Sequence, residues 1–145
     1  MLVRFKKLNK NAVIPSYGSP FSAGCDLSAC LEEKVEIAPH TTVKIPTGLA
    51  MELPLNTVGL IYARSGMATK RHLAPANKVG VVDADYRGEI IVALHNHSNE
   101  VQVVEPGERI AQFVITPFYH AEFEEAEELS ETVRGEGGFG STGTK

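Results

Sequence analysis

The stretch VEIAPHTTVKIPTGLAMEL, residues 35–53, carries the clearest structural pattern in the chain. Val35 and Ile37 alternate with polar neighbours, and Val43 and Ile45 repeat the alternation after a proline-containing break. Alternation with a period of two is typical of half-buried β-strands, and proline and glycine mark the turns between them. We therefore expect short strands in this stretch, each ended by a turn.

Three further runs rich in β-branched residues have the length of strands: TVGLIYA (57–63), GEIIVALHN (88–96) and RIAQFVITPF (109–118). Short strands at fairly even spacing are typical of sandwiches and barrels. One short helix is expected within SGMATKRHLA (65–74), where Ser65 could cap the first turn. The chain is therefore predicted to be all-β, a jelly-roll-like β-barrel or sandwich with one short helix.

The composition limits the possible functions. A chain of 145 residues with 43% hydrophobic and 22% charged residues is typical of one globular domain with a real core. The net charge of −4 argues against a general nucleic-acid or membrane surface, although arginines could still hold a small anion. No apolar run approaches the ~18 residues of a membrane span, and residues 1–10 lack the apolar stretch of a signal peptide. Cys25 and Cys30 are too few for a disulfide scaffold, so we expect a cytoplasmic protein.

The chain changes character after Phe118. Residues 119–133 contain six glutamates, as expected of a solvated connector. The end of the chain, RGEGGFGSTGTK (134–145), is rich in glycine and could be a disordered terminus. It could also be an anion-binding flap, in which glycine amides wrap a phosphate, Arg134 binds it and Phe139 stacks on a ring. We expect a core over residues 1–118 and an arm with a glycine-rich flap over 119–145, both in one domain.

Polar residues stand at two strand positions where they could bind an anion. ARSGMA (63–68) puts Arg64 and Ser65 where a strand ends and the helix begins, and unpaired amides at such a place bind anions readily. The alternative is a capping serine and a surface ion pair. Gln112 lies inside an apolar run, where its side chain either faces solvent or reaches a partner.

Two aspartates are candidates for chemistry. Asp83, in NKVGVVDADYRGEI (77–90), lies at a strand end, where a partly desolvated carboxylate could orient and deprotonate a water molecule. It could equally be one more turn aspartate. Asp26, in AGCDLSA (23–29), either forms an Asx-turn or lies near the water shell of a metal.

Three other kinds of binding site are not expected. His95 and His97 would share a strand face, but no third zinc ligand accompanies them. The glycines of the tail precede no Gly-Lys-Ser/Thr, so they form no Walker A loop. GEGGFG (135–140) follows a glutamate-rich arm rather than a strand, which excludes a dinucleotide-binding fold.

Five motifs, taken together and in order, resemble those of the homotrimeric dUTP diphosphatase (dUTPase) family. They are AGCDLSA, ARSGMA, GVVDADYRG, GERIAQF and RGEGGFGSTG, which span about Ala23 to Gly143. Any one motif would be weak evidence for the family, but five motifs in this order are specific evidence for it. Cys25 and Glu108 depart from the residues that the family often has at these positions, and neither position carries the chemistry.

The resemblance implies a β jelly roll that hydrolyses dUTP to dUMP and pyrophosphate by attack of water on the α-phosphate. This reaction limits uracil incorporation into DNA and supplies dUMP for thymidylate synthesis. The resemblance also implies Mg²⁺ held by the triphosphate and waters, without direct protein ligands. In the family each site is assembled from three subunits of a homotrimer, and the tail is donated across the trimer.

The resemblance assigns roles to individual residues. Asp83 matches the aspartate that activates the attacking water, Asn77 the asparagine that reads the uracil edge, and Tyr86 the ring that packs under the deoxyribose. Asp26 matches a motif aspartate that supports the site. Phe139 matches the phenylalanine that stacks over uracil. The remaining substrate-binding positions are Arg64, Ser65, Gly66, Gly80, Gln112, Arg134, Gly140, Ser141 and Thr142.

Two rival functions remain, a dCTP deaminase and a catalytically silent trimer. A dCTP deaminase of the same fold has a different motif after the arginine and lacks the phenylalanine-containing tail, so RSGMA and RGEGGFGSTG count against it. A catalytically silent nucleotide-binding or regulatory trimer would be expected to have lost Asp83 or the tail, and this sequence has both.

Overall fold

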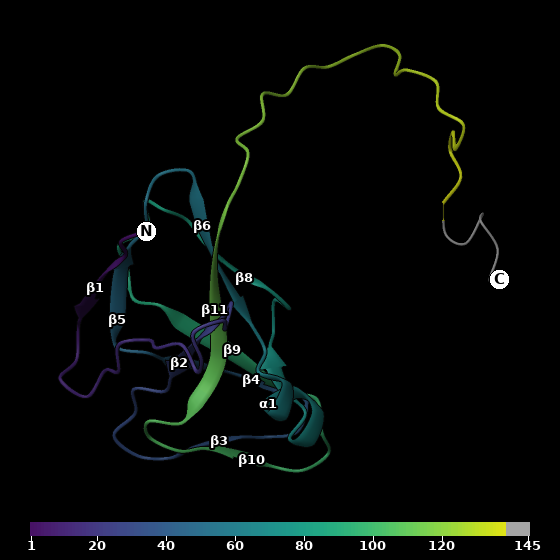
Figure 1. The fold of residues 1–145 in the computed structure, drawn as a ribbon. Helices are drawn as coiled ribbons and strands as arrows, with labels where there is room; N and C mark the ends of the chain where they lie inside the picture. The colour runs from purple at the N-terminus through teal and green to yellow at the C-terminus, as the bar shows by residue number, and fades with distance from the viewer. Residues whose placement is uncertain (139–145) are drawn as a thin grey trace.

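The computed structural model describes residues 1–138, and in this part of the chain almost every regular element is a β-strand (Figure 1). The elements in chain order are β1 (Arg4–Lys7), β2 (Cys25–Ser28), β3 (Val35–Ile37), β4 (Thr42–Pro46), β5 (Leu49–Glu52), β6 (Thr57–Tyr62), α1 (Ser65–Lys70), β7 (Leu73–Pro75), β8 (Gly80–Val82), β9 (Ile91–Asn96), β10 (Gln102–Val104) and β11 (Arg109–Pro117). The prediction of an all-β fold with one short helix is confirmed.

The strands form two larger sheets and two two-stranded sheets, and all pairings are antiparallel. The larger sheets have the orders β2-β11-β6-β8 and β4-β9-β7, and the pairs are β1-β5 and β10-β3. The sheets close around one hydrophobic core, to which both larger sheets contribute. This arrangement is the jelly-roll-like sandwich that the short strands predict.

The β9 strand shows how the alternation builds the core. Val92 and Leu94 are buried, and the strand residues that alternate with them are more exposed. Asn96 is the next inward residue and is fully buried, which requires hydrogen bonds for its amide. Its Nδ2 donates to the carbonyls of Ile37 (2.9 Å) and Glu100 (2.7 Å), so this buried amide ties β9 to the end of β3.

The stretch 35–53 contains β3, β4 and β5, as the alternation predicts. The breaks occur at His40 and Gly48, whose φ angles of 56° and 67° lie in the left-handed region. At Gly48 a Cβ atom would also lie 2.7 Å from Cys30 Sγ, so only glycine fits this tight connection between β4 and β5.

The helix differs from its prediction in two ways. Arg64, with φ −78° and ψ 135°, occupies the N-cap position of α1 without a capping side-chain bond, and Ser65 is already helical, so the prediction of Ser65 as the cap was wrong. The helix also ends at Lys70 rather than near residue 74. His72 adopts a left-handed φ of 55°, which stops the helix, and β7 begins at the next residue.

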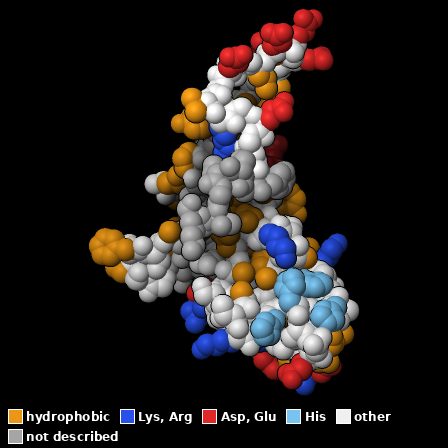
Figure 2. All heavy atoms as spheres, turned by 90° about the vertical axis from the view of Figure 1, so that its right-hand side faces the viewer, with side chains coloured by type: hydrophobic (Ala, Val, Ile, Leu, Met, Phe, Trp, Pro, Cys, Tyr) orange, Lys and Arg blue, Asp and Glu red, His pale blue; other side chains and the backbone are white. Residues whose placement is uncertain are grey.

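A histidine patch lies on one face of the molecule, where Figure 2 shows these side chains gathered. The rings of His95 and His97 are 4.4 Å apart and meet edge to face, so they are neighbours as expected. Desolvation, followed by the nearby His95, Lys78, His40 and His72, lowers the pKa of His97 below its ordinary value. Within residues 1–138, no group of three His, Cys, Asp or Glu side chains is arranged to hold a metal ion.

The arm leaves the body after β11. Residues 119–138 contain neither helix nor strand, are almost entirely exposed, and curve away from the strands in Figure 1. Among the described residues, no helix is both long and apolar enough to cross a membrane.

The close packing of β6 on β11 makes a prediction about stability. A Cβ atom at Gly59 would lie 2.4 Å from the ring of the fully buried Phe113. Overpacking of this kind costs about 1–3 kcal/mol, so Gly59→Ala should lower the free energy of unfolding in urea by that amount. Gly18→Ala is the matched control, because its Cβ would have only the Ser22 hydroxyl nearby, at 3.9 Å. Equal urea midpoints for Gly59→Ala and the wild type would contradict this account of the packing.

Candidate active site

The first half of the site, here called the arginine pocket, is a polar hollow between β2, β11 and the start of α1. Its lining residues are Gly18, Ser22, Gly24, Asp26, Arg64, Ser65, Gly66, Arg109 and Gln112. Asp26 organises it through both carboxylate oxygens. Arg64 Nε donates to Oδ1 (2.8 Å) and Arg109 Nη1 donates to Oδ2 (3.0 Å). One carboxylate thus holds two guanidinium groups. Arg64 Nη1 also donates to the carbonyl of Arg109 (3.3 Å), and the other guanidinium donors can bind an anion.

The register of β11 places Gln112 in this pocket. Gln112 pairs with Asp26 of β2 on one side and with Tyr62 of β6 on the other. Its Nε2 donates to the carbonyl of Ala63 (2.8 Å), so the side chain has a protein partner and is not simply turned to solvent. A Cβ atom at Gly24 would lie 3.0 Å from Gln112 Oε1, which makes glycine the residue that leaves room for this amide.

The start of α1 supplies the remaining groups of the arginine pocket. Ser65 and Gly66 are exposed and lie in the first turn of the helix, where backbone amides lack acceptors within the helix. No heavy atom lies within 4 Å of where a Cβ of Gly66 would be, so a ligand can approach the backbone there. Arginines, a hydroxyl and free amides form a site for a multiply charged anion.

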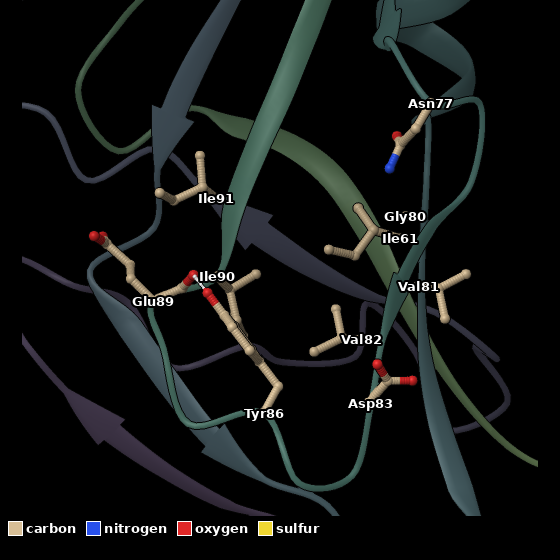
Figure 3. Close-up of a pocket in the computed structure, with 10 residues that line it drawn as sticks. All are labelled: Ile61, Asn77, Gly80, Val81, Val82, Asp83, Tyr86, Glu89, Ile90 and Ile91. Carbon is tan, nitrogen blue, oxygen red and sulfur yellow. Dashed lines mark hydrogen bonds between the residues drawn. The ribbon is translucent and has the colours of Figure 1, made fainter.

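The second half of the site, here called the turn pocket, lies between β6, β8 and the start of β9 (Figure 3). Its lining residues are Ile61, Asn77, Gly80, Val81, Val82, Asp83, Tyr86, Glu89, Ile90 and Ile91. In Figure 3, Asp83 and Tyr86 lie at one end of the pocket and Asn77 at the other, with aliphatic side chains between them. An apolar floor with polar groups at both ends suits a flat heterocycle joined to a polar group.

Asp83 directly follows β8, as the sequence predicts. Its backbone carbonyl accepts a bond from the amide of Tyr86 (3.2 Å), which closes the turn. The carboxylate is exposed in the single chain, so the partial desolvation expected for a catalytic aspartate is not supplied by this chain alone. The Tyr86 hydroxyl donates to the carbonyl of Glu89 (2.9 Å), which lays the ring across the turn.

Asn77 and Gly80 shape the other end of the turn pocket. Asn77 lies in the tight connection between β7 and β8, where Lys78 adopts a φ of 65°. A Cβ atom at Gly80 would lie 3.1 Å from Ile61 Cβ and 3.4 Å from Asn77 Nδ2. The glycine therefore keeps the pocket open beside the amide of Asn77.

The predicted site residues divide between these two pockets, which share no lining residue. Arg134 lies in neither, since it is on the exposed arm, where its Nε donates to the carbonyl of Gly137 (2.8 Å). Four other predicted residues lie outside the described part of the chain: Phe139, Gly140, Ser141 and Thr142. A single chain therefore offers two separate partial sites.

The sequence interpretation missed Arg109. It stands three positions before Gln112 in the same motif, and this proximity was the available signal. Its approach to Asp26 depends on the pairing of β2 with β11, which shifts register between Arg109 and Ala111. Glu108, the position that departs from the family pattern, points elsewhere and pairs with Arg71 at the end of α1.

Comparison with known proteins identifies the class to which this fold and site belong. The family model for dUTPase matches residues 10–143. The deoxyuridine 5'-triphosphate nucleotidohydrolase of Desulfitobacterium hafniense is 51% identical over 97% of this chain and 94% of its own length. The enzyme of the same name from Acinetobacter baumannii is 47% identical over 94% of this chain and 92% of its own.

Solved structures agree with this relationship. A variant of the Staphylococcus bacteriophage 80alpha dUTPase with dUpNHpp superposes with a TM-score of 0.89, at 30% identity and 98% coverage of each chain. A variant of the dUTPase from phage phi11 of S. aureus, described with a structural Mg(II) ion, has the same fold. Its TM-score is 0.82 at 24% identity, and the match covers 90% of this chain and 100% of the phage chain. The chain belongs to the dUTPase family.

The arginine pocket makes a prediction for the residue that the sequence interpretation missed. Arg109→Met should weaken the binding of inorganic triphosphate about 10- to 150-fold, because a hydrogen bond to a charged group is worth about 1.5–3 kcal/mol. Isothermal titration calorimetry measures this loss. The control is Arg4→Met, since Arg4 forms a similar 3.0 Å ion pair with Glu52 but lies outside the pocket. Unchanged affinity in Arg109→Met would reduce Arg109 to an ion-pair partner of Asp26.

Proposed function

We propose that this protein hydrolyses dUTP to dUMP and pyrophosphate, which limits uracil incorporation into DNA and supplies dUMP for thymidylate synthesis. The observation that carries the proposal is the pair of pockets. One is apolar with amide and carboxylate groups at its ends, and the other is built from two arginines held by Asp26. These chemistries suit a nucleoside and a triphosphate respectively. Relatives that are 47–51% identical carry the name deoxyuridine 5'-triphosphate nucleotidohydrolase.

In the proposed reaction, Asp83 acts as the general base. Its carboxylate accepts a proton from a water molecule, whose oxygen attacks the α-phosphorus as the bond to the bridging oxygen of pyrophosphate breaks. Arg64 and Arg109 stabilise the negative charge on the phosphate oxygens. The Ser65 hydroxyl, the backbone amides of Ser65 and Gly66, and the Gln112 side chain hold the triphosphate in position.

The nucleoside binds in the turn pocket in this proposal. Asn77 hydrogen-bonds the uracil edge beside the open space at Gly80, and the Tyr86 ring packs against the deoxyribose and excludes a 2′-hydroxyl. The tail completes the site, with Phe139 stacked on the uracil. The tail binds the phosphates through groups of Arg134, Gly140, Ser141 and Thr142. Ordering of this glycine-rich segment on the substrate excludes other water molecules from the reaction.

Mg²⁺ fits this site as an ion carried by the triphosphate. Both oxygens of Asp26 already accept bonds from arginines, and Asp83 lines the other pocket, so these carboxylates would meet the ion through water molecules rather than as direct ligands. Asp26 is the residue placed to contact the water shell of the ion. When bound, the ion neutralises part of the charge on the phosphates.

A homotrimer with shared sites accounts for the separation of the two pockets. In this proposal the nucleoside occupies the turn pocket of one subunit, the triphosphate the arginine pocket of a second, and the tail comes from a third. The rim of the turn pocket supports this, because Val81 and Ile91 are large apolar residues that are 64% and 45% exposed in the single chain. Residues 1–118 then act as the core and 119–145 as the arm and flap.

The proposed location is the cytoplasm. Cys25 and Cys30 are both free, as is usual in a reducing compartment. The proposal includes no nucleic-acid or membrane partner, since the net charge is −4.

The proposed reaction predicts that pyrophosphate is released from dUTP in preference to dATP, dCTP, dGTP and dTTP. Asp83→Asn should lower kcat by about 10²–10⁴-fold, because it removes the general base, while dUTP still binds. Asp85→Asn is the matched control, since Asp85 lies on the same exposed turn but outside the pocket. Ammonia release from dCTP would indicate a deaminase instead, and an Asp83→Asn variant with more than about a tenth of the wild-type kcat would reject the assignment of the base.

The shared site predicts recovery of activity by subunit mixing. A chain truncated after Val133 and the Asp83→Asn chain should each be nearly inactive. Unfolding and refolding them together in equal amounts should return about a quarter (½ × ½) of the activity of the refolded wild type, because random assembly joins a sound Asp83 to a sound tail from another chain. No recovery, with mixed trimers confirmed by native mass spectrometry, would mean that each tail serves its own chain.

A further inference from the structure

We propose that Gly88 and Glu89 are positioning residues for Tyr86, and that they set how strongly the enzyme discriminates deoxyribonucleotides from ribonucleotides. The proposal rests on the proposed function, in which the Tyr86 ring lies against the sugar. In that function an exposed ring has to be held firmly in order to exclude a single hydroxyl group. Tyr86 is 45% exposed, so packing from the core alone cannot hold it.

Gly88 supports the ring by its lack of a side chain. A Cβ atom at Gly88 would lie 2.4 Å from Tyr86 Oη, 2.5 Å from Cζ and 2.9 Å from Cε2. Non-bonded carbon contacts are normally about 3.5–4.0 Å, so the ring occupies the space that any other residue at position 88 would fill. Among the described glycines, positive φ angles occur at Gly48, Gly107 and Gly135 and not at Gly88. The backbone at position 88 therefore accepts alanine, and the contact with the ring is the reason for glycine.

Glu89 holds the same hydroxyl end of the ring, and two hydrogen bonds link it to Tyr86 on one side and to Gly48 on the other. Its carbonyl accepts the bond from the Tyr86 hydroxyl (2.9 Å), as drawn in Figure 3, and its Oε1 accepts a bond from the amide of Gly48 (2.8 Å). Gly48 lies in the tight β4–β5 connection, where a Cβ would meet Cys30 Sγ. The next residue, Ile90, also donates its amide to the carbonyl of Leu49 (2.8 Å). The tyrosine is thus tied through Glu89 to the body of the fold.

Discrimination by a steric wall requires that the wall stay in place. A methyl group at position 88 would push the tyrosine tip away by about 1 Å and break its bond to Glu89, since the ring is exposed and free to move outward. A displaced ring would no longer stand where the proposed site needs it to exclude a 2′-hydroxyl. The specificity of the turn pocket therefore depends on Gly88 and Glu89 as well as on Tyr86.

A double-mutant cycle tests the proposal through kcat/KM for dUTP divided by kcat/KM for UTP. Gly88→Ala should lower this ratio about tenfold, a change of the size that one group in a pocket supports. In a Tyr86→Ala background the same substitution should change the ratio less than twofold, because the clash is gone. If Gly88→Ala lowered the ratio equally with Tyr86 and with Ala at position 86, the proposal would be overturned, because Gly88 would then act without contacting the Tyr86 ring.

Further variants separate positioning from folding. Tyr86→Phe removes the bond to Glu89 without altering the backbone and should also lower the ratio, so the proposal stays testable if Gly88→Ala folds poorly. Glu89→Gln keeps an acceptor for the Gly48 amide and should preserve the ratio better than Glu89→Ala. Asp85→Ala, on the same turn, is the control and should leave the ratio unchanged. An unchanged ratio in Tyr86→Phe and Glu89→Ala would overturn the proposal.

A measurement independent of turnover distinguishes this proposal from the proposed function. The chain has four tyrosines, so ring-labelled tyrosine NMR can follow Tyr86. Gly88→Ala should shift the Tyr86 ring resonance and leave the other three in place, whether or not dUTP is hydrolysed. A wild-type protein that does not hydrolyse dUTP would reject the function alone, whereas an unshifted Tyr86 resonance would reject the role of Gly88.

Discussion

The position of β11 between β2 and β6 is the constraint on which the arginine pocket depends. In this register Gln112 stands opposite both Asp26 and Tyr62, so residues far apart in the chain meet at one level of the sheet. Asp26 then draws Arg64 and Arg109 together through its two oxygens. A shift of one residue in β11 would turn Gln112 to the other face of the sheet and remove the pocket. The same strand packs Phe113 against Gly59, which has no side chain. The packing of the core and the geometry of the arginine pocket therefore both depend on the same register of β11.

The two pockets divide the chemistry of the site according to what each backbone can provide. The arginine pocket is built on paired strands, where a carboxylate can hold cations with fixed geometry. The turn pocket is built on the connection from β8 to β9, where an aspartate and a tyrosine project beyond the end of a strand. The first pocket needs fixed charges, and the second needs an open edge through which a ligand can enter. Under the proposed function, assembly of each site between subunits would bring the two separate pockets together.

Much of the fold follows from the sequence, because the longer strands carry a clear alternation and their turns contain proline and glycine. The strand β7 was not predicted because the stretch 65–74 was assigned to the helix, and the three-residue strand β10 was not predicted either. The cap of α1 was assigned to Ser65, since serine is a common cap, but the chain uses Arg64 without a side-chain bond. Arg109 was missed because its partner lies 83 positions away, and non-local pairing leaves no local pattern. In the turn pocket, Asp83 was a candidate from its position at a strand end, whereas Asn77, Gly80 and Tyr86 came from the family resemblance. The contact between Tyr86 and Gly88 requires coordinates to be seen.

Under the proposed function, the exposed arm affects how tightly the tail would need to bind. Residues 119–138 would span about 65 Å if fully extended and about 25 Å on average as a flexible chain. A tether of this length keeps its end at a local concentration on the order of millimolar around a nearby site. The glutamates repel one another and keep the tether open, more so at low ionic strength. A segment presented in this way can bind weakly and still close often, so it can also release quickly once the substrate has become two smaller products.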